Sequence, residues 1–411
     1  MQTQTSPTMD RNNVRTPRHG TLGETSRQLA RDARALVADL ITSLRHRKER
    51  SGYLFVAING AGLGHLTRCL AVAGRIRQRA PNESIVFVTT SIAVPLVHQA
   101  GFVCHHITPF ALIGRDVSNR QWNDLFRRAL DAALRLHRPS TLVFDGSTPY
   151  EGLIRSMNDF RSVARVWIKR GSYKASVDAE KLARHTMNFD LTICPGELGD
   201  SVGMKEGSSI VTVDPILLID RSETLDRDTA RKLLQLREGS PAVFVQLGAG
   251  NINETNELQE SVIRALKRIG AQVVLARSPI ALRGLGHSSA DRTLIDYPSC
   301  KYYRAFDLAV LAGGYNSVNE AVFLGVPTIF IPNTTTGADD QLKRCRFTKR
   351  FGSYEVLEVF DEEELSRLSR MLIGRPRSSA ATESNLRNGA EEAADLIMNI
   401  GLSRKPPASE R

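Results

Sequence analysis

The segment of residues 306–344 constrains the fold of this chain more than any other, because signals for successive elements follow one another in it without a gap. Its apolar run at 308–311 predicts a buried parallel strand, which Gly313 and Gly314 interrupt. A helical stretch then ends at a Gly and a Pro, and residues 326–331 predict the next buried strand. Strand, glycine turn, helix and strand in this order are typical of a parallel α/β sheet.

The turn and the helix start predict a site for a diphosphate. Glycines let a ligand approach the backbone closely, and a helix start offers free N–H groups and a partial positive charge. We expect Asn316 or Ser317 to cap this helix. Glu320 lies about one turn further on, where its carboxylate can accept hydrogen bonds from the diol of a ribose. Asp340 and Gln341 follow the second strand, on the rim where ligands of α/β sheets bind. The alternative is an ordinary crossover with a tight turn.

These residues resemble the nucleotide-sugar-binding segment of the GT-B glycosyltransferases. The resemblance is to the group that contains the peptidoglycan lipid-linked N-acetylglucosaminyltransferase and the plant secondary-metabolite glucosyltransferases. It implies that a Gly-x-Asn-Ser-x-x-Glu pattern binds diphosphate and ribose, and that a later acid and Gln bind the donor sugar. The residues that match are Gly314, Asn316, Ser317, Glu320, Asp340 and Gln341. The plant enzymes have a phosphate-binding His where this chain has Ala312, so that contact must come from elsewhere.

A second glycine loop lies near the start of the chain. An apolar strand at 53–58 runs into a loop with Gly62, Gly64 and His65, and a helix follows. The spacing is not that of a dinucleotide-binding fingerprint. GT-B glycosyltransferases carry Gly-His at this first loop, and in several of them the His is the general base. The loop also resembles that of the nucleotide-sugar hydrolase of pseudaminic acid biosynthesis, in which the matching His activates water. A helix-capping or phosphate-contacting His is the alternative for His65.

Three further positions complete the expected site. Asp145 ends a strand at 141–144, where it can orient His65, as an Asp does in plant members of the family; the alternative is a simple helix cap. Gly248, Gly250 and Asn251 match the loop that opens the donor domain of GT-B enzymes. Two arginines near these loops are expected to form surface ion pairs rather than to act in the site: Arg68 and Arg277.

The alternation of strands and helices predicts an α/β protein with two Rossmann-like domains that face each other across a cleft, the GT-B arrangement, with helices on both faces of parallel sheets. The expected parts are a disordered tail at 1–25, a basic amphipathic helix at 26–50, an acceptor domain at 51–220, a donor domain at 221–385, and a C-terminal helix that crosses back, with a tail, at 386–411. We expect a loop at 108–120, a strand at 293–297, and helices at 122–137, 226–236, 254–269, 361–372 and 380–400.

Composition limits where such a protein acts. The formal net charge is +11, and residues 1–50 hold ten Lys or Arg against five Asp or Glu. The helix at 26–50 therefore either packs on the next domain or lies on an anionic membrane surface. The basic charge is not accompanied by any nucleic-acid-binding motif, so we expect that the protein does not bind nucleic acid. The five cysteines form no CxxC pair, which favours a reducing cytoplasm. No run of about 18 apolar residues predicts a membrane span.

The resemblance implies a hexosyltransferase that moves a sugar from a nucleotide-sugar donor, with UDP favoured, to a hydroxyl of a small or lipid-linked acceptor. With His65 as base in a single displacement, transfer inverts the anomeric centre. We expect no cofactor and no metal, because the glycine turns can neutralise the leaving diphosphate and no Asp-x-Asp site is present. The alternatives are a nucleotide-sugar hydrolase or 2-epimerase on the same fold, and a non-catalytic protein that binds nucleotides or membranes.

Overall fold

The computed structural model describes residue 34 and residues 50–58, 62–170, 173–174, 177–197, 203–204, 209–248, 256–280, 288–335, 339–375 and 386–403. The predicted tail at 1–25 lies outside the described residues. So does the predicted basic helix at 26–50, apart from Arg34 and Arg50. The domain boundaries given above stay predictions.

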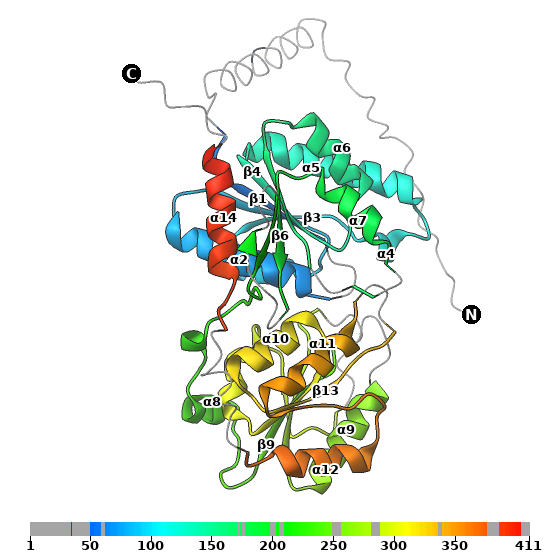
Figure 1. Cartoon of the computed structure of the whole chain (residues 1–411), viewed down its shortest axis with the longest axis vertical. Helices are drawn as coiled ribbons and strands as arrows, with labels where there is room; N and C mark the ends of the chain where they lie inside the picture. Colours follow the sequence, from blue (N-terminus) through cyan, green and yellow to red (C-terminus); the bar gives the residue numbers. More distant parts are fainter. Residues whose placement is uncertain are drawn as a thin grey trace, which may run out of the picture. The chain divides into compact units, whose positions relative to one another are not determined.

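Figure 1 labels β1, β3, β4 and β6 of the first of two sheets, here called the N-terminal sheet. Its strand order is β3-β2-β1-β4-β5-β6-β8-β7. Its strands are β1 (Tyr53–Ala57), β2 (Ile85–Thr89), β3 (Val103–His106), β4 (Thr141–Asp145), β5 (Ala164–Ile168), β6 (Leu191–Pro195), β7 (Gly203–Met204) and β8 (Ile210–Val213). All neighbouring strands are parallel except β7 and β8, which are antiparallel.

The second, here called the C-terminal sheet, is parallel throughout and has the order β11-β10-β9-β12-β13-β14. Its strands are β9 (Ala242–Gln246), β10 (Gln272–Ala276), β11 (Arg292–Leu294), β12 (Leu308–Ala312), β13 (Thr328–Ile331) and β14 (Tyr354–Val356). In both sheets the chain order reverses beside the first strand, at β1/β4 and at β9/β12. Ligands of such sheets bind at the carboxyl ends of the two strands where the order reverses.

Helices connect the strands of both sheets. Those of the N-terminal half are α2 (Gly64–Arg79), α3 (Val94–Gln99), α4 (Phe110–Ile113), α5 (Asn119–His137), α6 (Glu151–Asp159) and α7 (Ala179–Thr186). The later ones are α8 (Arg227–Leu233), α9 (Asn256–Arg268), α10 (Tyr315–Leu324), α11 (Gln341–Thr348), α12 (Glu362–Leu372) and α14 (Ala390–Ser403), with 3₁₀ helices η1 (Arg221–Glu223), η2 (Ser299–Ala305) and η3 (Lys349–Phe351).

Helices cover both faces of each sheet because successive side chains of a strand point to opposite faces. Phe55 and Ala57 of β1 belong to the core under α2 and α14, whereas Leu54 and Val56 belong to the core under α5 and α6. The C-terminal sheet is covered in the same way, by η2 and α10 on one face and by α9 and α12 on the other. The predicted α/β fold with two parallel-strand sheets is confirmed.

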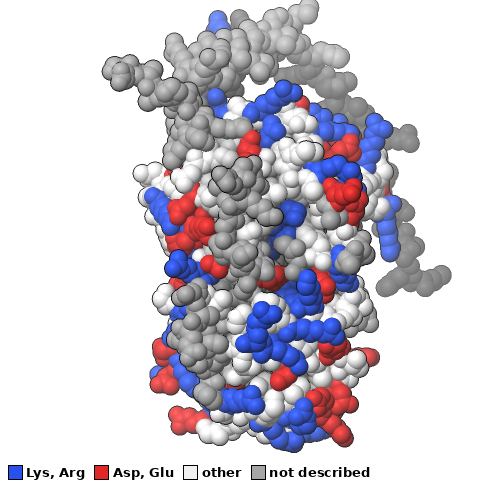
Figure 2. Space-filling view, in the orientation of Figure 1, with Lys and Arg blue, Asp and Glu red and all other residues white. Residues whose placement is uncertain are grey.

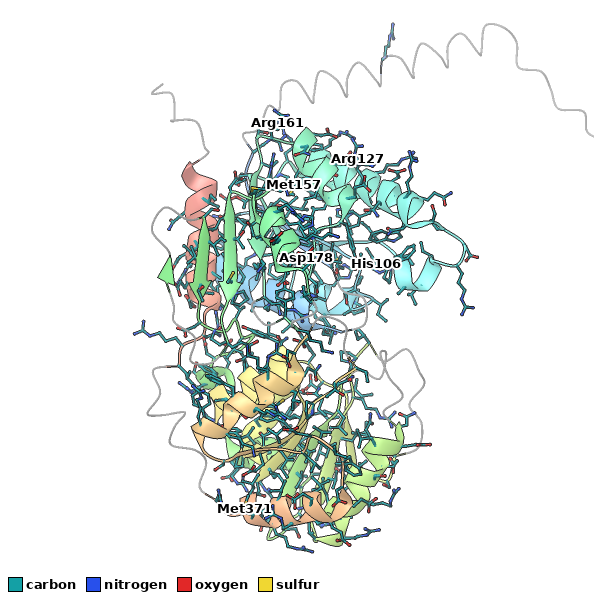
Figure 3. The ribbon with its side chains drawn as sticks, turned by 45° about the vertical axis from the view of Figure 1, so that its right-hand side comes forward. His106, Arg127, Met157, Arg161, Asp178 and Met371 are labelled. Carbon is teal, nitrogen blue, oxygen red and sulfur yellow. The ribbon has the colours of Figure 1, made fainter. Side chains whose placement is uncertain are left out.

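The C-terminal helix α14 packs against the N-terminal sheet rather than against the C-terminal sheet that precedes it in the chain. α14 packs on α2 and contacts β4 and β5, and its buried residues share one core with β1. Helices α5 and α6 cover the other face of the N-terminal sheet. In Figure 3, Arg127 of α5 and Met157 of α6 are labelled there. Arg127 pairs there with Asp159 at the end of α6, at 2.6 Å.

Several element boundaries differ from the prediction. The expected loop at 108–120 contains the short helix α4, which follows Pro109 and packs Phe110 edge-on against Trp122. α5 begins at Asn119 rather than at residue 122, because Ser118 and Gln121 form a reciprocal capping box.

The later boundaries differ as well. β11 spans Arg292–Leu294 and so includes only the first two residues of the strand expected at 293–297. α8 ends at Leu233, three residues before the end of the helix expected at 226–236. Gln235 has a left-handed backbone conformation, with φ of 52°, which cannot continue a helix. The last helix begins at Ala390 in the described chain, whereas residues 380–385 of the predicted helix at 380–400 lie outside it.

The surface carries charges of both signs. On the face shown in Figure 2, Lys and Arg side chains are interspersed with Asp and Glu side chains among the described residues. Among the helices that the structure describes, none combines the length and the apolar character that crossing a membrane requires.

Candidate active site

The N-terminal part of the site forms where β1 and β4 lie side by side. Ala57 at the end of β1 is in register with Asp145 at the end of β4. α2 begins seven residues after β1, at Gly64, so the first turn of this helix lies at the same edge of the sheet as Asp145. The prediction placed the catalytic pair at this edge.

His65 and Asp145 are hydrogen-bonded. His65 Nδ1 lies 2.6 Å from Asp145 Oδ1, and Asp145 is completely buried. Because the carboxylate only accepts, Nδ1 carries the proton and Nε2 keeps its lone pair. A carboxylate that fixes the tautomer in this way leaves Nε2 able to take a proton from a substrate.

A buried arginine completes this group. Arg68 Nε donates to Asp145 Oδ2 at 2.9 Å, and Arg68 Nη2 donates to Asp145 Oδ1 at 2.6 Å. The expected surface ion pair of Arg68 is wrong, since its side chain is only 2% exposed. Arg68 lies on the turn of α2 that follows His65, so its side chain points to the same buried carboxylate. Sequence reasoning counts charges near a loop and does not show which of them become buried.

Burial and neighbouring charges set the protonation of the pair. Burial lowers the pKa of His65. The charge of Asp145 raises this pKa, but Arg68 and Arg170 lower it, so the pKa of His65 stays below its usual value. Burial would raise the pKa of Asp145, but Arg68 and His65 lower it below its usual value. At neutral pH the pair is therefore a carboxylate and a neutral imidazole, which is the state that a general base needs.

The C-terminal part of the site forms where β9 and β12 lie side by side. Leu311 of β12 is in register with Gln246 of β9, so the turns after both strands meet at one edge. Gly313 follows β12, and a Cβ there would lie 2.6 Å from Cys345 Sγ, so a larger residue would displace the Cys345 side chain. Gly248 follows β9 with φ of +94°, a conformation that favours Gly. Gly250 and Asn251 lie outside the described residues.

The start of α10 differs from the prediction. Gly314 is the N-cap residue and makes no side-chain capping hydrogen bond, and the helix begins at Tyr315. Asn316 and Ser317 therefore lie within the first turn, and the predicted cap by either residue is wrong. No side chain caps the first N–H groups of α10, and helix starts of this kind can bind an anion.

Glu320 lies in the second turn of α10 and is partly buried. Burial raises the pKa of its carboxyl to about 7, although a hydrogen bond with the Cys300 thiol opposes the rise. Burial raises the pKa of Tyr297, and the charge of the Glu320 carboxylate raises it further. An acidic group held in this way suits a neutral hydrogen-bonding ligand such as a diol.

The other predicted donor-site residues have partners within the protein. Asp340 caps α11, accepting a hydrogen bond from Lys343 N at 3.0 Å. Gln341 Oε1 accepts a hydrogen bond from Asn333 N at 2.9 Å and lies beside Gly313. Gly62 and Gly64 of the first loop have open space where a Cβ would lie. Sugar binding by Asp340 and Gln341 stays a prediction, and so does the role of Gly62 and Gly64 in the first loop.

Two contacts join the first turn of α2 to the C-terminal half. Thr67 Oγ1 lies 2.8 Å from Tyr297 Oη, within hydrogen-bonding distance. The Arg68 guanidinium lies over the ring of Tyr315, 5.2 Å from its centroid. The structure thus brings His65 and Asp145 next to the residues that surround Glu320 and the start of α10.

Sequence reasoning missed a buried ion cluster at this junction. Arg344 of α11 donates to Glu197, after β6, at 2.9 Å and to Asp339 at 2.8 Å. Arg344 also donates to the carbonyl of Gly313 at 3.0 Å, and Arg170 lies 3.5 Å from Asp339. The only signal in the sequence is a set of charges directly after predicted strands and on a short helix. In the described ranges, no group of three or more His, Cys, Asp or Glu side chains could hold a metal ion.

The chain is similar to known glycosyltransferases in sequence and in structure. The chain is 24% identical, over 335 residues, to the UDP-N-acetylglucosamine–N-acetylmuramyl-(pentapeptide) pyrophosphoryl-undecaprenol N-acetylglucosamine transferase of Acetivibrio thermocellus, covering 74% of this chain and 84% of the relative. MurG of Acinetobacter baumannii matches in structure with a TM-score of 0.56 at 14% identity, over 85% of this chain and 99% of its own. The spinosyn forosaminyltransferase SpnP matches over the same shares, with a TM-score of 0.60 at 15% identity.

The predicted resemblance to the GT-B glycosyltransferases is confirmed. The structural likeness shows that the chain has the GT-B fold, and the edges at β1/β4 and β9/β12 are the two halves of its candidate site. No protein-family model matches the chain.

Proposed function

We propose that this GT-B protein transfers a sugar from a nucleoside-diphosphate sugar to an acceptor hydroxyl, with His65 as general base. The observation that carries the proposal is the His65–Asp145 hydrogen bond on a helix whose first turn also contacts Tyr297 and Tyr315 beside the second glycine turn. The curated relatives and the solved neighbours agree with the predicted function and enzyme class, a nucleotide-sugar glycosyltransferase.

The proposed reaction is a single displacement. The acceptor hydroxyl gives its proton to Nε2 of His65 while its oxygen bonds to the anomeric carbon of the sugar. The bond between that carbon and the diphosphate oxygen breaks, and the nucleoside diphosphate leaves with the electron pair. Attack opposite to the leaving group inverts the anomeric centre. A positioned base contributes about 10²- to 10⁴-fold to such a step.

The leaving diphosphate would bind at the turn after β12. The N-terminal N–H groups of α10 and its dipole favour an anion there. Gly313 and Gly314 would let the phosphates approach the backbone, and Glu320 would accept hydrogen bonds from the ribose hydroxyls. The N–H groups and dipole of α10 would supply the charge stabilisation for which other transferases use a metal ion, so we propose that the reaction is metal-independent.

The donor is proposed to be a UDP-sugar and the acceptor a lipid-linked hydroxyl compound. Both follow from the names of relatives such as the Acetivibrio thermocellus enzyme, which acts on UDP-N-acetylglucosamine and a pyrophosphoryl-undecaprenol acceptor. A nucleotide-sugar donor and an acceptor are the partners that the relatives share. We further propose that the protein works in the cytoplasm at the inner membrane face, which residues 26–50 would contact.

Product analysis tests the proposal. The full chain is incubated with UDP-sugars and TDP-sugars, alone and with extracted polyprenyl-linked acceptors, with His65→Ala as the control. Acceptor-dependent release of nucleoside diphosphate together with a glycosylated product supports transfer. Rapid donor loss without acceptor would instead identify a nucleotide-sugar hydrolase, and nucleotide binding without donor consumption would identify a non-catalytic protein.

A further inference from the structure

Arg68 has more contacts in the candidate site than a single ion pair requires. Its guanidinium donates twice to Asp145. Nη2 also lies 2.9 Å from His65 Nδ1, but both atoms are donors to the same Asp145 oxygen, so this approach is not a hydrogen bond. The same guanidinium lies over the ring of Tyr315, the first residue of α10. Arg68 therefore lies between the candidate base and the turn that is proposed to bind the diphosphate.

Tyr315 is itself held by both halves of the chain. Its hydroxyl donates to the carbonyl of Gly196 at 2.9 Å, and its ring is buried. Arg344 lies over the same ring, 5.6 Å from the centroid, and donates to the carbonyl of Gly313 in the glycine turn. Two guanidinium groups from different halves thus contact one aromatic ring at the start of the proposed diphosphate-binding helix. A cation over the face of an aromatic ring is attracted to it, so the ring stabilises both groups.

We propose that Arg68 is a positioning residue that keeps Asp145 ionised and aligned for His65, and that Tyr315 holds Arg68 in place. The inference rests on the proposed function, because it assigns a role within that site. It links the base to the donor turn through the path His65, Asp145, Arg68 and Tyr315, in which every step is a contact in the structure.

The physical reason is the complete burial of Asp145. A carboxylate without water is stable only when a cation and hydrogen bonds compensate for its lost hydration. Arg68 supplies two parallel hydrogen bonds, a geometry that a lysine ammonium cannot reproduce. The charged groups that act on His65 are Asp145 on β4, Arg68 on its own helix and Arg170 after β5. Two of these three are cations, so removing Arg68 makes protonation of His65 easier.

The test follows the titration of the His65 ring by NMR in the full chain, in wild type and in three variants. Arg68→Met removes the charge, and Arg68→Lys keeps the charge but not the paired geometry. Arg75→Met is the matched control, because Arg75 lies on the same helix, is mostly buried and pairs with Asp220 at 2.6 Å, away from His65. We expect the His65 midpoint to rise by about one pH unit in Arg68→Met. It should stay near wild type in Arg68→Lys and Arg75→Met.

A second pair of variants tests the link to the donor turn and also serves if Arg68→Met does not fold. Tyr315→Phe keeps the ring under Arg68, whereas Tyr315→Leu removes it. Tyr315→Leu should raise the His65 midpoint and lower kcat more than Tyr315→Phe does. An unchanged His65 midpoint in folded Arg68→Met, or in Tyr315→Leu when Arg68→Met cannot be obtained, would overturn the inference. Because the titration needs no substrate, a shift without any glycosyl transfer would refute only the proposed function.

Discussion

Asp145 and Glu320 are two buried or partly buried carboxyls at matching edges of the two sheets, and the surroundings shift their pKa values in opposite directions. Burial raises both pKa values. Arg68 and His65 overcome the effect for Asp145, whose pKa is lowered. Glu320 has a thiol hydrogen bond from Cys300, and its pKa remains raised, at about 7.

The difference shows how the two halves divide the work. The N-terminal edge has its charges paired within the protein, which suits a group that must present one defined tautomer to a proton donor. The C-terminal edge offers backbone N–H groups and a carboxyl with little compensation, which suits a site completed by a ligand. The partners of a buried carboxyl, rather than its burial, decide which of these it serves.

Removing the imidazole of His65 should have the largest effect of the changes predicted here, and it acts on the N-terminal half of the site. We expect His65→Ala to lower kcat by about 10²- to 10⁴-fold, because proton removal from the acceptor is lost, while the Kd of UDP changes little. Steady-state transfer assays and calorimetry with UDP measure the two quantities. His98→Ala, an exposed His on α3, should match wild type. A kcat for His65→Ala within threefold of wild type would exclude His65 as the base.

Neutralising each carboxyl should affect stability in different ways. Asp145→Asn leaves Arg68 buried beside a neutral amide, so we expect a loss of about 3–5 kcal/mol in the free energy of unfolding. Glu320→Gln removes a poorly compensated charge, so we expect stability to be unchanged or raised by up to about 1 kcal/mol. Denaturant unfolding measures both, with Asp159→Asn as the exposed ion-pair control. Equal losses in the two variants would remove the distinction drawn between the carboxyls.

Nucleotide affinity tests the ligand role of Glu320. If its carboxylate accepts hydrogen bonds from ribose hydroxyls, Glu320→Ala should weaken UDP binding by about tenfold to a hundredfold, since hydrogen bonds to charged groups contribute about 1.5–3 kcal/mol. Calorimetry with UDP provides the value, and Glu363→Ala on the exposed side of α12 is the control. Unaltered affinity would show that the donor site has been assigned to the wrong residues.

The pH dependence of binding and stability should give the smallest effect. The pKa of Glu320 is raised in the folded chain from the usual 4.5 to about 7, so its stabilising contribution is present below pH 4.5 and is lost as the pH rises through about 7. UDP binding needs the ionised form, so the Kd should rise as the pH falls below about 7. Glu320→Gln should abolish both dependences. Wild type and Glu320→Gln with identical profiles between pH 5 and 8 would contradict the assignment.

The acid limb of turnover provides the contrasting measurement. Burial and two neighbouring cations lower the pKa of His65, so the neutral base persists at pH values below its usual 6.5, and kcat should decline only at more acidic pH. Asp145, whose pKa is lowered, stays ionised throughout that range, and its contribution to stability is lost only as the pH falls below its usual 3.8.

Much of the candidate site could be predicted because its signals are local. The glycine turn at Gly313 and Gly314 directly follows the apolar strand β12 and precedes α10. Asp145 is the last residue of β4, and His65 lies in the first turn of the helix that follows β1. In a parallel sheet, the ends of such strands must meet at one edge. β1 is a run of apolar residues, so alternate side chains of this strand could be expected to enter the cores on both faces of the sheet.

Tertiary structure alone decided the protonation of the site and its internal contacts. Arg68 is 77 residues from Asp145, and Arg344 is 147 residues from Glu197, so no periodicity in the sequence relates these partners. The capping of α10 by Gly314 rather than by Asn316 or Ser317 likewise depends on where the turn packs. The sequence by itself determined, to within one residue, where the central strands β1, β4 and β12 end, since this depends on neighbours along the chain. Which charges become buried together depends on folding, because the free energy of a buried charge is set by groups that only folding brings near.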